Sequence, residues 1–222
     1  MPRRTVIKVC GLTRREDAAF ALACGADWLG FIVHGDSPRR VEPEHAARIV
    51  EAVGGGVPVA VMVGVTPEQA LELAQRSRAQ RIQLHRVSPA GWPADFPLPV
   101  AFSMGVTPEG TVVGEEPALG HLLLLDTSHG GQAGGTGRTW PWHVARGLAG
   151  RRDVMLAGGL QGDNVAEAIR TLQPFGVDAS SALESSPGIK DHELVRRFVQ
   201  AARAAALAAD PPSRTAPNPP AS

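Results

Sequence analysis

The sequence predicts an α/β fold, specifically a single-domain (β/α)8 TIM barrel with some degenerate helices. Eight short apolar segments, each typical of a buried strand, alternate with helical or degenerate helical segments. The chain has 222 residues, of which 43% are hydrophobic, and single α/β barrels begin at about this size. Strands that alternate with helices favour a parallel sheet, and the regular count of eight favours closure. An open doubly wound sheet remains the alternative, but it would not require this count.

The first strand–helix unit shows why each element is expected. Thr5–Val9 lacks the alternation of a half-exposed strand, so it is predicted to be buried on both faces, with Cys10 at its carboxyl end. Thr13–Glu16 has the pattern of a capping box, which predicts a helix from about Arg14 to Cys24. Gly25 then ends this helix as a left-handed stop.

The later units follow the same logic. The further strands are predicted at 27–33, 57–63, 82–85, 98–104, 121–126, 154–157 and 177–180. The further helices are predicted at about 43–53, 66–77, 141–148, 163–172 and 191–209, the second of them beginning at a capping box and the fourth capped by Asp163 and Asn164. Segments 88–97 and 105–120 carry poor helical signals. Residues 1–209 are therefore expected to form the barrel domain, and the proline-rich residues 210–222 a disordered tail.

Composition narrows the function classes. The chain balances 22 basic against 22 acidic residues, which gives no general attraction to nucleic acid or to a membrane surface, so any anion site must be local. Two cysteines are too few for a disulfide framework and suggest a reducing compartment. No stretch approaches 18 consecutive apolar residues. These features predict a cytoplasmic protein with neither nucleic acid nor membrane as a partner.

The carboxyl ends of the strands carry most of the chemistry. In a barrel these ends meet at one mouth, so residues far apart in sequence become neighbours. A thiol at the end of a buried strand is either a small core residue or a reactive group, and this convergence favours the reactive group for Cys10. The candidates at the mouth, in chain order, are Cys10, Arg39, Gln83, His85, Asp126, Gly158, Gly159, Asp178, Ser180 and Ser181.

The last two loops suggest a phosphate site. Gly158 and Gly159 permit a close approach of the backbone to a ligand, and Ser180 and Ser181 offer amide and hydroxyl donors. The loops after strands seven and eight are the usual phosphate site of such barrels. The alternative is that the two glycines form only a tight strand-to-helix turn.

Three side chains at the mouth each allow a catalytic or binding interpretation and a structural one. Asp126 ends a run of leucines, and loss of hydration there would raise its pKa and favour proton donation; otherwise it caps the next turn. Arg39 could bind a carboxylate through two hydrogen bonds, or simply lie in solvent. His85 at a strand end is more often a structural hydrogen-bonding group than a catalyst.

Two further patterns point away from metals and nucleotides. The histidines lack the spacing of a His-Glu-x-x-His metal motif, so no metal is expected. The glycine-rich run 134–137 lacks the lysine of a nucleotide P-loop, and the loop 129–137 is interpreted as a flexible lid.

Taken together, the motifs resemble one family over about residues 5–205. They are Lys-Val-Cys-Gly-Leu-Thr (8–13), Gly-Ala-Asp-x-x-Gly-Phe (25–31), Ser-Pro-Arg (37–39), Gln-Leu-His (83–85), Leu-Leu-Asp-Thr (124–127), Gly-Gly-Thr-Gly (134–137), Leu-Ala-Gly-Gly-Leu (156–160), Asp-x-Ser-Ser (178–181) and Pro-Gly-x-Lys-Asp (187–191). Each motif alone is weak, but together, in order and at the strand ends, they resemble phosphoribosylanthranilate isomerase, the barrel enzyme of tryptophan biosynthesis.

The resemblance implies an Amadori rearrangement of N-(5'-phosphoribosyl)anthranilate, a small phosphoribosyl substrate, without cofactor or metal. Asp126 resembles the general acid and Cys10 the general base. The thiol pKa would be lowered by Arg39 and by the helix beginning near Thr13.

The other candidate residues match binding positions of the family. Arg39 matches the position that holds the anthranilate carboxylate, and the two glycines and two serines match the phosphate loops. Gln83, His85 and Asp178 are expected to contact the substrate. The protein is expected to be a monomer or a homodimer.

Two other functions compete with this interpretation. The sister barrel isomerase of histidine biosynthesis is expected to have Asp at the end of strand one, where this chain has Cys10. A non-catalytic paralogue that binds phosphosugars is the second alternative. It is favoured only by departures from the family pattern: 34–36 before Ser-Pro-Arg, Arg86 and Ala182 where Gly is usual, no lysine in strand five, and Pro141 where Asp is usual.

Overall fold

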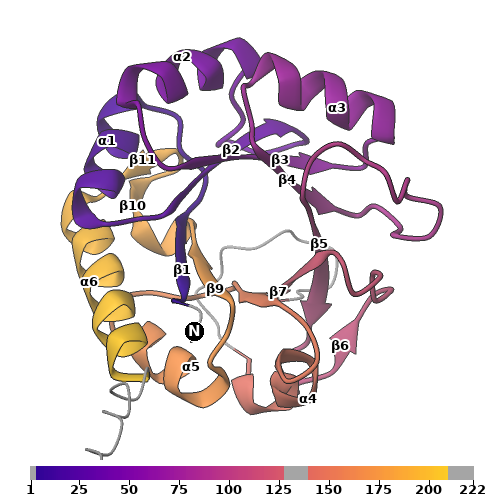
Figure 1. The fold of residues 1–222 in the computed structure, drawn as a ribbon. Coiled ribbons are helices and arrows are strands. Elements are labelled where there is room, and N and C mark those ends of the chain that lie inside the picture. Colours follow the sequence, from indigo (N-terminus) through magenta and orange to yellow (C-terminus); the bar gives the residue numbers. More distant parts are fainter. Residues whose placement is uncertain (1–3, 128–139, 210–222) are drawn as a thin grey trace, which may run out of the picture.

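The strands form a closed ring in the computed structural model, which describes residues 4–127 and 140–209 (Figure 1). The ring runs in the order β4-β3-β2-β1-β9-β8-β7-β5, every pairing is parallel, and a pairing of β4 with β5 closes it. This confirms the predicted eight-stranded barrel. Its strands are β1 (Val6–Val9), β2 (Trp28–His34), β3 (Val57–Val63), β4 (Arg81–His85), β5 (Val100–Val106), β7 (Leu122–Thr127), β8 (Val154–Leu156) and β9 (Gly176–Ala179).

Helices surround the ring on its outside (Figure 1). They are α1 (Arg15–Cys24), α2 (Pro43–Val53), α3 (Pro67–Arg76), the short η1 (Trp142–Ala145) and α4 (Arg146–Ala149), α5 (Val165–Leu172) and α6 (His192–Ala209). The segments 88–97 and 105–120, whose sequences carry poor helical signals, contain no helix in the structure. The second segment instead contains β6 (Val112–Val113), which pairs antiparallel with β5. Neither β6 nor the hairpin of β10 (Glu184–Ser186) and β11 (Ile189–Lys190) was anticipated.

The start of α1 corrects one expectation. Arg14 occupies the N-cap position and makes no side-chain capping bond, so the predicted capping box at Thr13–Glu16 is wrong. The Thr13 hydroxyl donates instead to the backbone carbonyl of Gly188, a contact between distant parts of the chain that local sequence cannot reveal. The predicted stop at Gly25 is confirmed, with a φ of 102°.

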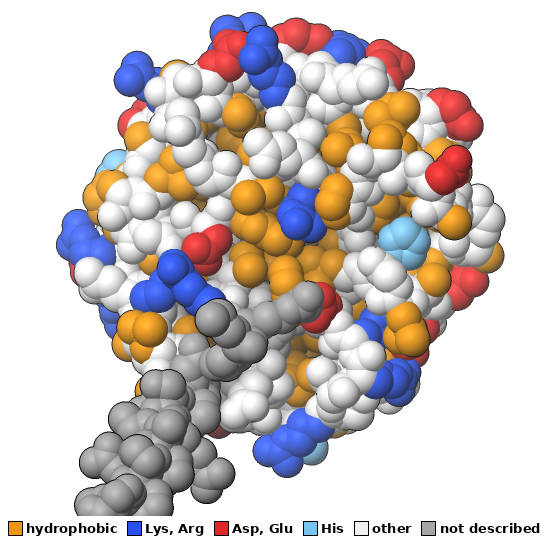
Figure 2. All heavy atoms as spheres, in the orientation of Figure 1, with side chains coloured by type: hydrophobic (Ala, Val, Ile, Leu, Met, Phe, Trp, Pro, Cys, Tyr) orange, Lys and Arg blue, Asp and Glu red, His pale blue; other side chains and the backbone are white. Residues whose placement is uncertain are grey.

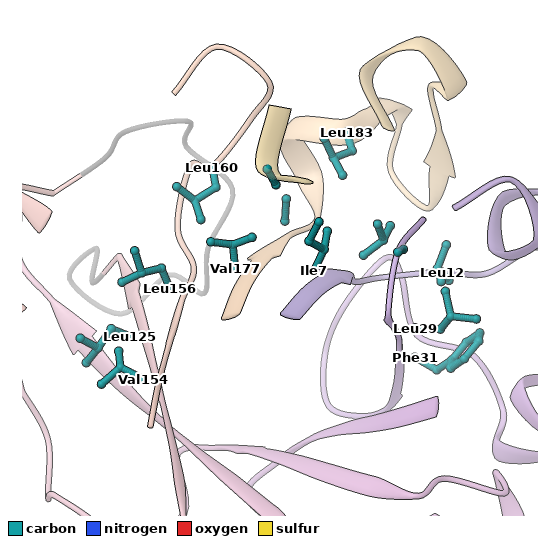
Figure 3. Packing of buried hydrophobic residues seen from close by; sticks show 14 of the residues in the cluster. Ile7, Leu12, Leu29, Phe31, Leu125, Val154, Leu156, Leu160, Val177 and Leu183 are labelled. Carbon is teal, nitrogen blue, oxygen red and sulfur yellow. The ribbon is translucent and has the colours of Figure 1, made fainter. Parts of the chain in front are cut away.

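The apolar core has two parts, one outside the barrel wall and one inside it. Figure 3 shows outward-facing residues such as Ile7, Leu156 and Val177, which are fully buried between strands and helices. A second cluster fills the barrel itself, and Figure 2 shows hydrophobic side chains at the centre of the ring. Arg81 lies over the ring of Trp28, a member of this cluster, 4.6 Å from its centroid. The barrel is therefore a packed core and not a channel. The inner cluster comprises Trp28, Val59, Leu124, Met155 and Ala157.

Two predicted segments lie outside the described residues: the tail 210–222 and the glycine-rich loop 129–137. Their disorder and lid role stay predictions. None of the described helices is both long enough and apolar enough to cross a membrane.

The capping box of α3 supports a stability prediction. The Thr66 hydroxyl accepts from the Gln69 amide, and the Gln69 side chain accepts from the Thr66 amide. Thr66→Ala is expected to lower the free energy of unfolding by about 1 kcal/mol, because it leaves the Gln69 amide without this partner. Urea unfolding measures this. Thr66→Ser, which keeps the hydroxyl, serves as the control, and an equal loss in both variants would contradict the capping role.

Candidate active site

The mouth of the barrel is organised by the pairing of β1 with β9. Lys8 lies directly across from Asp178 in this parallel pair, and the Cys10 amide donates to the carbonyl of Ala179 at 2.9 Å. Because side chains alternate along a strand, Lys8 and Cys10 point to the same face of β1, the barrel interior. Two predicted residues, Cys10 and Asp178, are thereby brought together around Lys8, which was not predicted.

Lys8 is a fully buried ammonium that connects Cys10 to Asp178. Its Nζ donates to Oδ2 of Asp178 at 2.7 Å, and its side chain also lies next to the Cys10 thiol, both packing around Gly30 of β2. Burial alone would lower the pKa of Lys8, but Asp178 and Cys10 together raise it above its ordinary value. Burial raises the pKa of Asp178, and Lys8 opposes that rise. Lys8 is therefore charged at neutral pH.

The thiol of Cys10 departs from the expectation. Burial raises its pKa above the ordinary value, and the opposing effects of Lys8 and Lys190 do not cancel this rise. The expected lowering by Arg39 and the first helix is therefore wrong. The guanidinium of Arg39 is engaged by a carboxylate, and α1 begins only at Arg15. The positive charges that favour the thiolate come from the two lysines instead.

The pKa of Asp126 is raised, as predicted from the apolar residues that precede it. It stands at the carboxyl end of β7, half-buried after three fully buried leucines. Burial raises the pKa of its carboxyl group to about 6, although a hydrogen bond from the Thr127 amide at 2.7 Å opposes the rise. Asp178 adds to the rise and Lys8 opposes it. This carboxyl group can hold a proton close to neutral pH, as a general acid must.

Gln83 and His85 lie on the same face of β4 and contact each other. Nε2 of Gln83 lies 2.8 Å from Nε2 of His85. Burial, followed by the nearby charges of Lys8 and Arg86, lowers the pKa of His85 to about 4, so its imidazole is neutral at physiological pH. The structure thus gives His85 the structural hydrogen bond considered from the sequence.

Arg39 belongs to a cluster with Glu184 and Lys190. Nε of Arg39 donates to both carboxylate oxygens of Glu184, at 2.9 and 3.0 Å, and Nη2 donates at 2.9 Å. Nζ of Lys190 donates to the same carboxylate at 2.8 Å. Gly11 makes room for this cluster, because a Cβ there would lie 2.8 Å from Cδ of Arg39 and 2.6 Å from Oγ of Ser180. The solvated-loop alternative for Arg39 is therefore excluded.

The two expected phosphate loops follow neighbouring strands, β8 and β9. Gly158 and Gly159 have φ angles of 83° and 70°, which side chains rarely adopt. A Cβ on Gly158 would lie 2.1 Å from Oγ1 of Thr127 and 2.9 Å from Oδ1 of Asp126. The first glycine therefore allows its loop to pack directly against the candidate acid.

Further contacts hold both loops in place. Asn164 is the N-cap residue of α5 but makes no side-chain capping bond, contrary to expectation. Its amide group donates instead to the carbonyl of Gly159 and accepts from the Gln161 amide, both at 2.9 Å. In the second loop, Nζ of Lys190 donates to the carbonyl of Ser180 at 3.0 Å. The loops are thus shaped by bonds that the sequence did not reveal.

Two departures from the family pattern have different consequences. Arg86 adopts a φ of 54°, in the left-handed region where glycine is favoured. Ala182 lies in the short turn η2 (Ser181–Leu183) and is not among the described residues with positive φ. An alanine therefore fits the second loop without backbone strain.

Sequence reasoning missed three residues of the site: Lys8, Glu184 and Lys190. A signal for Lys8 was present, because a lysine inside a strand buried on both faces requires a partner. No local signal identifies Glu184, whose partner Arg39 is 145 residues away. The described residues contain no group of three or more His, Cys, Asp or Glu side chains arranged to hold a metal.

Comparison with known proteins shows the family to which this chain belongs. The family model described as N-(5'phosphoribosyl)anthranilate (PRA) isomerase matches residues 7–201. The N-(5'-phosphoribosyl)anthranilate isomerase of Rubrobacter xylanophilus is 41% identical over 208 residues, covering 89% of this chain and 98% of the relative.

Solved structures agree. A phosphoribosyl anthranilate isomerase in complex with reduced 1-(o-carboxyphenylamino)-1-deoxyribulose 5-phosphate superposes with a TM-score of 0.73 at 30% identity, over 90% of this chain and 99% of that one. Monomers generated from the dimeric isomerase of Thermotoga maritima give 0.74 at 31% identity, again over 90% and 99%.

The raised pKa of Asp126 predicts a stability effect with a defined sign. The folded pKa lies above that of an unfolded aspartate, so the ionised carboxylate costs folding free energy above about pH 6, and the cost fades as the pH falls towards 4. Asp126→Asn removes this cost, and asparagine can still accept from the Thr127 amide. The variant is expected to be more stable by about 2 kcal/mol at pH 8 and close to the parent at pH 4. Urea unfolding at both pH values tests this, and a loss of stability at pH 8 would contradict it.

Proposed function

The chain belongs to the N-(5'-phosphoribosyl)anthranilate isomerase family, and we propose that Asp126 and Cys10 carry out the proton transfers of its reaction. Membership makes the chain an isomerase of tryptophan biosynthesis. One observation supports the residue roles most directly. A carboxyl group whose pKa is raised to about 6 and a thiol next to a buried ammonium face the same mouth.

The proposed sequence begins with protonation of the substrate. The Asp126 carboxyl donates a proton to the furanose ring oxygen, and the bond from that oxygen to C1 breaks as the amine nitrogen forms a Schiff base. The Cys10 thiolate then removes the proton from C2, and the electron pair passes through the C1–C2 bond to the nitrogen, giving an enolamine. Loss of the hydroxyl proton at C2 and addition of a proton at C1 give the ketone. No proton is consumed overall, so side chains suffice.

Binding of the substrate is proposed to use two anion sites. The loops at Gly158–Gly159 and Ser180–Ser181 would hold the phosphate, since they follow neighbouring strands and combine open backbone with hydroxyl donors. Arg39 would hold the anthranilate carboxylate. Its contacts with Glu184 run through Nε and Nη2, which leaves the outer edge of the guanidinium for a second carboxylate. Gln83, His85 and Asp178 are proposed to contact the sugar.

We also propose a location and an oligomeric state. A cytoplasmic location is proposed, because both cysteines are free, as expected of a protein in a reducing compartment. A homodimer is proposed over a monomer, because the isomerase of Thermotoga maritima is described as dimeric.

The catalytic roles predict the effect of two substitutions. Cys10→Ala and Asp126→Asn are each expected to lower kcat by about 10²–10⁴-fold, because each removes one proton carrier. Loss of anthranilate fluorescence from freshly prepared phosphoribosylanthranilate measures the rate. Cys24→Ala, which removes the other thiol, should retain the parent rate. Full activity of Cys10→Ala would show that the base is another group.

Glu184 provides a prediction for substrate binding. Glu184→Gln removes the charge that orients Arg39 and Lys190, so KM is expected to rise about tenfold while kcat changes less than about threefold. Glu116→Gln is the matched control, because Glu116 also pairs with two basic side chains, Arg151 and Arg152, outside the cluster at the mouth. A fall in KM would contradict orientation and indicate that Glu184 competes with the substrate for Arg39.

A further inference from the structure

Lys8 places a positive charge inside the barrel, where the fold does not require one. Lys8 has no exposed surface, and an ammonium ion loses several kcal/mol of hydration on burial. Replacing a buried ion pair by apolar residues is often neutral or stabilising, so stability alone does not explain this lysine. The interior cluster below it is already packed with Trp28, Leu124 and Met155.

The side chains of Lys8 and Cys10 both pack against Gly30. On the neighbouring strand β2, a Cβ at Gly30 would lie 2.7 Å from Sγ of Cys10 and 3.1 Å from Cε of Lys8. Any larger residue at this position would push the two side chains away. The absence of a side chain at Gly30 therefore lets the side chains of Lys8 and Cys10 lie next to each other.

The partners of Lys8 leave its charge available. Asp178 binds it through Oδ2 only, and Oδ1 of Asp178 is buried without a hydrogen-bond partner among the described residues. The carboxylate therefore holds the ammonium at one point and keeps it charged. An ammonium has three N–H donors, so the single bond to Asp178 leaves donors for the neighbouring Cys10 sulfur.

We propose that Lys8 is a positioning residue of the isomerisation: its ammonium stabilises the thiolate form of Cys10, while Asp178 holds that ammonium in place. This inference rests on the proposed role of Cys10 as base. The charged groups that act on the thiol are Lys8 on β1, Asp178 on β9 and Lys190 on β11. Lys8 is the strongest of those that favour the thiolate, and Asp178 disfavours it. The two members of this ion pair therefore act in opposite directions on the pKa of the thiol, and this makes the inference testable.

The test titrates the thiol directly. In a Cys24→Ala background only Cys10 can ionise as a thiol, and the chain contains no tyrosine whose ionisation would mask the ultraviolet absorbance of the thiolate. Lys8→Met is expected to move the inflection upward by about one pH unit or more, a tenfold loss of thiolate at a given pH. Asp178→Asn removes the negative charge, while the amide oxygen of asparagine can still accept from Nζ of Lys8, so this variant is expected to move the inflection downward. The kcat of Lys8→Met should fall at least about tenfold and partly recover at higher pH.

The outcomes separate this inference from alternatives. If the ion pair only holds the barrel together, both substitutions loosen the site and move the inflection in the same direction, which would overturn the proposal. An unchanged inflection or an unchanged kcat in Lys8→Met would also overturn it. Should Lys8→Met fail to fold by urea unfolding, the direction of the shift in Asp178→Asn decides. The titration requires no turnover, so full activity of Cys10→Ala would refute the proposed base without affecting this measurement.

Discussion

The register between β1 and β9 is the constraint on which the mouth of this barrel depends. It places Lys8 directly across from Asp178, and both residues are buried inside the ring. Either charge without the other would cost several kcal/mol, so the strands cannot slip without separating the pair. Side chains repeat every second residue along a strand, so the same register brings Cys10 and Ser180 to the rim. Closure of the barrel and placement of the chemistry therefore follow from one pairing.

Much of the fold could be predicted, because its signals are local. Runs of apolar residues bounded by glycine and proline mark the strands. The helix Pro43–Val53 and the strand Val57–Val63 have the predicted bounds. The environment of Asp126 was also readable, since the leucines that desolvate it precede it directly in sequence. The order of strands then determined which side chains share the mouth.

What could not be predicted depends on contacts between distant segments. Thr13 matches a helix cap but bonds Gly188, 175 residues away. Arg39 looked like a group free to lower the pKa of Cys10, yet Glu184 from the last loop engages it. Burial of Cys10 then raises its pKa, a balance that needs the distances to two lysines. Local pattern identifies which residues reach the mouth, but their protonation depends on the partners they meet there.

Charge at the mouth explains how a chain with no net charge could recognise an anionic substrate. Lys8, Lys190 and Arg39 carry three positive charges, and two carboxylates, Asp178 and Glu184, pair with them. Among these described groups, the excess positive charge is offset when Asp126 is ionised, above about pH 6. A bound phosphate or carboxylate adds negative charge, which raises the pKa of a nearby carboxyl group further. We therefore expect substrate binding itself to favour the protonated form of Asp126, the form that the proposed first step requires.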